Sequence, residues 1–354
     1  MNFITKGLNR LKANTIYSER GFDFDKESTS VDEINSFALE KRGEDKLLAF
    51  DYLLFNYYYS PCAYTACNLI AGYVDFFSTE EEYTEGLPTF DFIESVGKYL
   101  EKASKYSDVF ESKEYFLTLA QFYLLQSVDN INKAFNLLNS VPTAYIDEDV
   151  QYLTGAMYFL LGMKEISAKM LEGALNSNDE EIKASSSLLL VKCGQVDEER
   201  SVELLGKALL SKKTAIITEA ISMLSGLDKF DIISKVESQK LISVMNGNLC
   251  YMLATAYNKV GDSDKLNALL DGVQGDELFE KVIESVKNGE SVDVDELTIS
   301  INQKRMEDIA DSEMYKYSDV YTRRMLNNEI METAQENEDF SELDYIALIP
   351  CYVK

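Results

Sequence analysis

Histidine and tryptophan are absent from this chain of 354 residues, and proline occurs only four times. Without histidine the chain cannot form a Ser-His or Cys-His catalytic pair, nor a histidine-ligated metal site. Without tryptophan it lacks the usual aromatic platform for stacking on sugars. Four prolines and 17 glycines favour long runs of helix joined by short turns.

Basic residues are scarce: 34 Lys and Arg stand against 61 Asp and Glu, a net charge of −27. Such a charge repels phosphate backbones and anionic membranes, so we expect neither direct nucleic-acid binding nor membrane binding. The distribution is uneven. Seven acids and no base lie in 75–94, six acids and no base lie in 331–344, and residues 1–20 are basic.

Long apolar runs are also missing, since none approaches the roughly 20 residues that span a bilayer. The first 20 residues contain scattered basic side chains and no continuous apolar core, so they do not resemble a secretory signal. The five cysteines form neither a disulfide framework nor a zinc pattern. We therefore expect a cytoplasmic protein with reduced cysteines that serve as small apolar groups.

No motif for cofactor chemistry is present. The chain has neither G-x-G-x-x-G nor G-x-x-x-x-G-K, the glycine-rich sequences that hold phosphates. The Asp-rich spots at 262–264 and 293–296 lack the central glycine and the terminal glutamate of a calcium loop. We expect no cofactor, no metal and no catalytic residues, and hence a protein that is not an enzyme.

Five short clusters recur along the middle of the chain, each with the i, i+3, i+4, i+7 spacing of one helical stripe. Their third members lie at 120, 156, 188, 220 and 254, which gives steps of 36, 32, 32 and 34 residues. A period in this range is typical of stacked helix pairs. The clusters are Phe116-Leu119-Ala120-Tyr123, Tyr152-Gly155-Ala156-Phe159, Ala184-Ser187-Leu188-Val191, Ile216-Glu219-Ala220-Met223 and Cys250-Leu253-Ala254-Tyr257.

We therefore predict an all-α, antiparallel helix-pair solenoid with about fifteen or more helices. Each pair begins with a helix that carries one cluster. The first helices are expected at 112–127, 147–162, 180–193, 213–226 and 247–260. The second helices are expected at 129–140, 164–177, 198–211, 229–243 and 263–272. Further helices are expected in 1–30 and at 32–59, 61–78, 89–106 and 295–337.

Three regions follow from this pattern. Residues 1–110 form an N-terminal helical segment that packs on the solenoid, and 111–287 form the repeat itself. Residues 288–354 combine off-period helices, an acidic stretch and an apolar tail at 345–353. We expect the tail to dock on the chain itself or on a neighbouring subunit and to cap an open end of the solenoid. Docking on a neighbour would produce an oligomer.

The repeat resembles the tetratricopeptide family over about 111–272. The resemblance rests on an apolar, a small and an aromatic residue at Leu253, Ala254 and Tyr257, followed by a Gly-Asp turn at 261–262. Further matches are Ala120-Tyr123, Ala156-Phe159 and Ala168. The resemblance implies a protein that binds a partner protein or peptide segment on the surface lined by its first helices.

A non-catalytic interaction module, acting as scaffold, adaptor or chaperone, is the main functional hypothesis. The alternative is a viral or mobile-element protein, structural or inhibitory, whose acidic surface imitates nucleic acid. For the first hypothesis we expect the partner to contact residues beside the small anchors of the first helices, with apolar contacts at one end and polar contacts at the other. These residues are Leu117, Leu124, Leu153, Met157, Leu160, Asn248, Tyr251, Thr255, Asn258 and Lys259.

Overall fold

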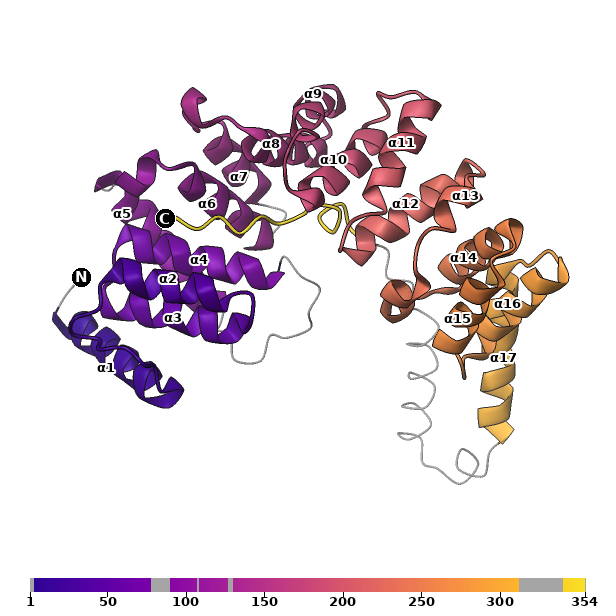
Figure 1. The fold of residues 1–354 in the computed structure, drawn as a ribbon, viewed down its shortest axis with the longest axis horizontal. Helices are drawn as coiled ribbons and strands as arrows, with labels where there is room; N and C mark the ends of the chain where they lie inside the picture. The colour runs from indigo at the N-terminus through magenta and orange to yellow at the C-terminus, as the bar shows by residue number, and fades with distance from the viewer. Residues whose placement is uncertain (1–2, 78–89, 107, 127–129, 312–339, 354) are drawn as a thin grey trace. The chain divides into compact units, whose positions relative to one another are not determined.

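The protein is described by a computed structural model that covers residues 3–77, 90–106, 108–126, 130–311 and 340–353. Within these ranges the chain is all-α and contains no strand. Its seventeen α-helices pack mainly against their neighbours in sequence, as in a helical solenoid (Figure 1). The predicted fold class is confirmed.

The chain forms two compact units. Unit 1 comprises Met1–Gln195 together with Ile346–Lys354, and unit 2 comprises Val196–Tyr345. The division therefore falls inside the repeat region at 111–287, and the end of the chain returns to the first unit. The two acidic stretches at 75–94 and 331–344 lie largely outside the described residues.

Among its described residues, unit 1 contains ten helices. They are α1 (Phe3–Arg20), α2 (Val31–Lys41), α3 (Lys46–Tyr59), α4 (Ala63–Phe77), α5 (Phe90–Ala103), α6 (Lys113–Gln126), α7 (Ile131–Leu138), α8 (Glu148–Leu160), α9 (Lys164–Ala174) and α10 (Glu180–Cys193). The described part of unit 2 contains seven helices. They are α11 (Glu198–Ala208), α12 (Thr214–Gly226), α13 (Phe230–Ile233), α14 (Gly247–Val260), α15 (Ser263–Gly272), α16 (Glu277–Asn288) and α17 (Val294–Asp311).

The five predicted first helices coincide with α6, α8, α10, α12 and α14 to within two residues at each end. Capping residues set these boundaries. Asp179 accepts a hydrogen bond from the amide of Ile182 at 3.3 Å at the start of α10, and Gly194 ends that helix in the left-handed conformation with φ 70°. The small anchors Ala120, Ala156 and Ala254 are all buried, as their role at helix contacts requires.

Two predicted helices are interrupted. The helix expected at 229–243 is α13 followed by a 3-10 helix, Ser238–Val244. Side chains of neighbouring helices satisfy carbonyl groups at the break: Tyr257 donates to the oxygen of Val236 at 2.7 Å and Lys265 to that of Ser234 at 2.9 Å. The helix expected at 32–59 is split into α2 and α3, because Asp45 caps a new helix by accepting from the amide of Leu48 at 2.9 Å.

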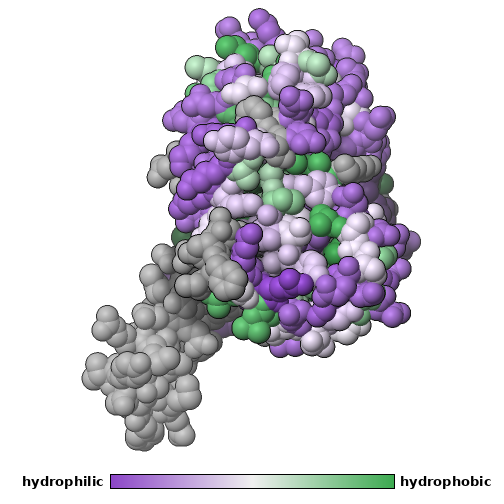
Figure 2. All heavy atoms as spheres, turned by 90° about the vertical axis from the view of Figure 1, so that its left-hand side faces the viewer, coloured by the Kyte–Doolittle hydropathy of each residue, from purple (hydrophilic) through white to green (hydrophobic). Residues whose placement is uncertain are grey.

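The N-terminal helix α1 leaves two of its leucines in solvent: Leu8 is 55% and Leu11 63% exposed. The buried contact is made instead by Ala13 and by the aromatic ring of Phe22 in the following loop, which stacks on Tyr52 with 4.2 Å between ring centroids. On the side of α1 and α5 the surface is mainly hydrophilic, with apolar residues in small separate groups (Figure 2).

Candidate functional site

The end of the chain lies across unit 1 as an extended segment. Residues 346–353, here called the docked tail, carry no helix and pass from α10 towards α4, so that they meet the helices in the reverse of their sequence order (Figure 1). Ile346, Ala347 and Cys351 are buried. The expected docking of the tail on the chain itself is what the structure shows, but the tail crosses helix faces and does not cap an end.

Polar side chains on four helices hold the backbone of the docked tail. We call this set the tail-binding face. It consists of Asn68 on α4, Thr118 and Gln121 on α6, Tyr152 on α8 and Ser185 on α10. All five side chains are buried, and buried polar groups need hydrogen-bond partners to offset the loss of water. Backbone groups of the tail supply these partners.

Gln121 lies in the middle of α6, among mostly apolar residues. Its Nε2 donates to the carbonyl oxygen of Ile349 at 2.7 Å, and the amide of Ile349 donates to its Oε1 at 2.5 Å. A second Nε2 proton is donated to the carbonyl oxygen of Leu117 at 3.2 Å. A primary amide thus pairs with both polar groups of one backbone residue, much as a neighbouring β-strand would.

Asn68 repeats this arrangement four residues further along the tail. It donates to the carbonyl oxygen of Val353 at 3.0 Å and accepts from the amide of the same residue at 2.8 Å. Its other Nδ2 proton is donated to Oδ1 of Asn35 at 2.8 Å, which fixes the orientation of the side chain. Between the two amide pairs, Thr118 donates to the carbonyl oxygen of Cys351 at 2.7 Å.

Tyr152 binds the beginning of the docked tail. The amide of Ala347 donates to its hydroxyl oxygen at 2.6 Å, and the carbonyl oxygen of Ala347 lies 3.2 Å from the same hydroxyl. The hydroxyl of Ser185 is 2.8 Å away and completes the cluster. Burial raises the pKa of Tyr152 well above its usual value, so the hydroxyl keeps its proton.

The contacts fall on every second residue. Carbonyl oxygens of 347, 349, 351 and 353 accept from the tail-binding face, and the amides of 347, 349 and 353 donate to it. Alternate residues of an extended chain point their polar groups to the same side. Pro350 stands at an even position, where its missing N–H costs no contact with the face.

A charged cluster holds the far end of the tail. Arg42 bonds Asp75 through Nε at 2.5 Å and through a terminal nitrogen at 2.9 Å, and the carboxylate is 4% exposed. The hydroxyl of Tyr352 donates to Oδ2 of Asp75 at 3.3 Å. The guanidinium of Arg42 lies 5.5 Å from the centre of the Tyr352 ring. This geometry combines a hydrogen bond to a charged acceptor with a cation–π contact.

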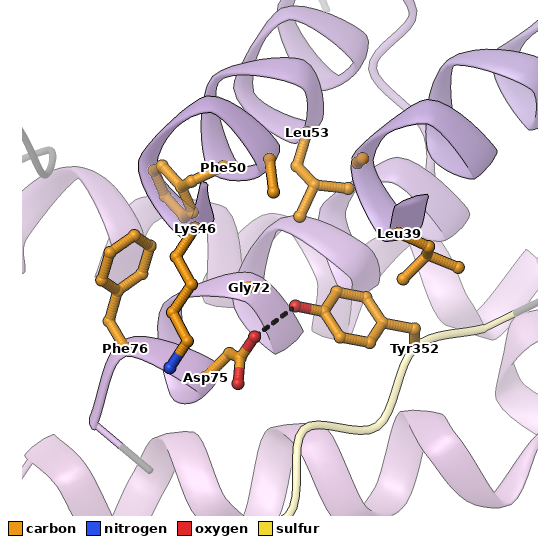
Figure 3. A pocket seen from close by; sticks show the side chains of 10 residues that line it. Leu39, Lys46, Phe50, Leu53, Gly72, Asp75, Phe76 and Tyr352 are labelled. Carbon is orange, nitrogen blue, oxygen red and sulfur yellow. Dashed lines mark hydrogen bonds between the residues drawn. The ribbon is translucent and has the colours of Figure 1, made fainter. Parts of the chain in front are cut away.

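A small pocket adjoins the ring of Tyr352. It lies between α2, α3 and α4 and has a volume of about 10 Å3, enough for about one water molecule. Figure 3 shows the hydroxyl of Tyr352 directed at Asp75, with Leu53, Phe50 and Leu39 above. The backbone of α4 lies close to the side chain of Leu53 at this point, because a Cβ added to Gly72 would lie 2.6 Å from Cδ1 of Leu53.

The ten partner-contact residues predicted from the sequence are divided between the units. On α6 and α8, Leu117, Leu124, Leu153 and Met157 are buried and Leu160 is half-buried, so they belong to the core of unit 1. On α14 in unit 2, Asn248, Asn258 and Lys259 are exposed, and Tyr251 and Thr255 are half-buried. Asn258 donates to the carbonyl oxygen of Val286 at 2.9 Å, and Lys259 lies 3.7 Å from the ring centre of Phe230.

The polar residues of the tail-binding face were missed by the sequence analysis. One signal was available: Asn68 and Gln121 interrupt the apolar helices AYTACNLIAGYVDFF and KEYFLTLAQFYLLQ. An amide within an apolar stretch needs a hydrogen-bond partner once it is buried. The sequence alone does not show that this partner lies more than 220 residues away in the chain.

The described residues also bear on metal binding and on membrane spanning. No group of three or more Cys, Asp or Glu side chains in the described part is placed to hold a metal ion. No helix in the same residues is both long and apolar enough to cross a bilayer. All five cysteines are free thiols, and only Cys62 is not buried.

No family model matches the chain, and a search of curated proteins finds no match.

Proposed function

We propose that the protein is a non-catalytic interaction module, a scaffold, adaptor or chaperone, whose tail-binding face takes up an extended segment of a partner protein. The docked tail is the observation that supports this proposal. It occupies the face through its backbone, so the contacts do not depend on most of its side chains. The resemblance to the tetratricopeptide family points in the same direction.

The bound tail acts as an internal stand-in for the partner. Side chains that bind N–H and C=O groups can hold any extended segment that brings its backbone to the same positions. When the tail leaves, the hydrogen bonds that these five buried side chains make to its backbone are lost, which favours rebinding of a segment of similar shape. The partner and the tail therefore compete for one face.

Peptide binding tests the proposal. The variant is the full chain with Ala347→Pro and Ile349→Pro. These substitutions remove two of the three backbone N–H groups that donate hydrogen bonds to the face. A fluorescein-labelled peptide of residues 341–353 is then titrated against this variant and followed by fluorescence anisotropy. We expect saturable binding that is at least tenfold tighter than to the wild-type chain, whose face is occupied.

Two controls complete the design. The same peptide with both prolines should not bind, and the circular dichroism of the variant chain should match that of the wild type. Absence of saturable binding to a correctly folded variant would contradict the proposed function.

A further inference from the structure

The two ends of the tail-binding face differ in chemistry from its centre. At the centre, Gln121 and Thr118 contact backbone groups alone. At one end Ala347 is buried and its backbone contacts the hydroxyl of Tyr152, and at the other the Tyr352 side chain contacts Arg42 and Asp75. Side-chain identity therefore matters at these two positions.

We propose that the face selects extended segments with a small residue and, five positions later, a tyrosine. This inference rests on the proposed function and specifies the partner. The tyrosine fills a subsite formed by Arg42 and Asp75, and the small residue fits against Tyr152. The fixed distance between the two subsites sets the register of the bound segment.

The tyrosine subsite favours tyrosine over phenylalanine. Asp75 is buried, and it accepts from the Tyr352 hydroxyl while Arg42 binds the same carboxylate. Phenylalanine would keep the contact with the guanidinium but would remove a donor from a desolvated carboxylate. Burial, followed by the negative charge of Asp75, raises the pKa of Tyr352, so the hydroxyl remains a donor at neutral pH.

The small-residue subsite is restrictive because the backbone there is held tightly. Ala347 is 2% exposed, and both of its backbone groups lie within 3.2 Å of the Tyr152 hydroxyl. A leucine at this position would have to displace buried neighbours or lift the backbone off Tyr152. Pro350 lies between the two subsites, and its nitrogen makes no hydrogen bond to the face. This position therefore accepts alanine as well as proline.

Register follows from the extended conformation. Five residues of extended chain span about 16 Å, so an added residue moves the tyrosine by about 3.3 Å and turns it to the opposite side. A segment with the right composition and the wrong spacing can therefore satisfy one subsite only.

A peptide series on the Ala347→Pro, Ile349→Pro chain tests the inference. The parent is the peptide of residues 341–353, and the variants are Tyr352→Phe, Ala347→Leu and a peptide with one glycine inserted after Ile349. We expect each variant to bind about tenfold or more weakly than the parent, in line with the loss of one hydrogen bond to a charged group or of a buried fit. Pro350→Ala is the matched control and should bind within threefold.

The possible failures are distinct. If the parent and all variants bind equally, the selectivity is wrong while the peptide-binding function stands. If the parent does not bind at all, the proposed function fails. A second measurement changes the subsite and not the peptide: Asp75→Asn should reduce the preference for Tyr352 over Phe, and an unchanged preference would overturn the assignment of the subsite.

Discussion

Gln121 and Ile349 form a closed pair of hydrogen bonds although 228 residues separate them in the chain. The side-chain amide of Gln121 binds both the N–H and the C=O of Ile349. Both Nε2 and Oε1 of this buried glutamine therefore have a hydrogen-bond partner in the tail. Asn68 makes the same pair with Val353. These two amides define the register in which the docked tail lies on unit 1.

Gln121→Ala should release the tail. The substitution removes two hydrogen bonds worth about 1 kcal/mol each, so the fraction of released tail should rise roughly 30-fold. The buried thiol of Cys351 reports release, because it reacts with a thiol reagent only when exposed. In a Cys62→Ser background, we expect Cys351 to be labelled about 10 to 100 times faster, and well before Cys67 and Cys193.

The control for this experiment is Gln239→Ala, an exposed glutamine in unit 2. It should leave the labelling rate of Cys351 unchanged. Equal rates in Gln121→Ala and in the parent would show that the amide pair does not hold the tail.

Arg42→Ala should destabilise the protein. It removes two donors from the buried carboxylate of Asp75 and leaves the hydroxyl of Tyr352 as a donor, so the substitution should cost about 1–3 kcal/mol. The exposed pair of Lys98 and Glu94, 2.7 Å apart, provides the comparison, and Lys98→Ala should cost less than about 0.5 kcal/mol. Urea unfolding measures both, and similar losses in the two variants would contradict the structural role assigned to Asp75.

Two glycine substitutions probe the packing of the helix pairs. A Cβ on Gly155 of α8 would lie 2.8 Å from Cγ and 3.2 Å from the backbone nitrogen of Leu171 on α9, so Gly155→Ala should cost about 1–3 kcal/mol. Gly206 of α11 has open space around the added Cβ, so Gly206→Ala should stabilise by about 0.5–1 kcal/mol. A Gly155→Ala chain that melts at or above the wild-type temperature would refute the close contact of α8 with α9.

Asp51 gives the stability a dependence on pH. Burial raises the pKa of Asp51 to about 6, and the opposing effect of Arg20, whose Nε lies 2.6 Å from the carboxylate, is smaller. The folded state thus binds a proton between about pH 4 and 6 that the unfolded chain has lost, so this contribution to stability falls as the pH rises through that window.

Asp51→Asn should remove this contribution. Relative to wild type, the variant should become more stable as the pH is raised from about 4 to about 7, as measured by urea unfolding at each pH. Arg20→Gln should shift the window to higher pH, because Arg20 lowers the pKa of Asp51. A difference between Asp51→Asn and wild type that stays constant with pH would contradict the raised pKa.

The sequence predicted local structure better than long-range contacts. The i, i+3, i+4, i+7 clusters located the first helices, because this signal lies within the structure it sets. In the structure, residues 179, 194, 197, 261 and 262 cap helix ends in the same local way. The breaks in 32–59 and 229–243 were missed, since alternative partners for the backbone came from Asp45 and from the side chains of α14 and α15. Helix α16 lies outside the predicted set, although Asp276 and Gly289 mark its ends.

The tail shows the same limit. Its apolar composition predicted docking, but its path depends on Asn68, Gln121 and Tyr152, which lie on three different helices. Periodicity assigns each of these residues to a helix and says nothing about which distant segment it meets. A buried amide in an apolar helix indicates that a partner exists, and only the fold identifies it.

Amide hydrogen exchange of the tail, resolved by residue with NMR, tests the account most directly. The amides of Ala347, Ile349 and Val353 donate to the tail-binding face, whereas those of Leu348, Cys351 and Tyr352 have no acceptor among the described residues. We predict that the first three exchange at least about tenfold more slowly than the other three, relative to the rates of an unstructured chain. Uniform exchange at unstructured rates along 346–353 would contradict the claim that this face holds an extended backbone.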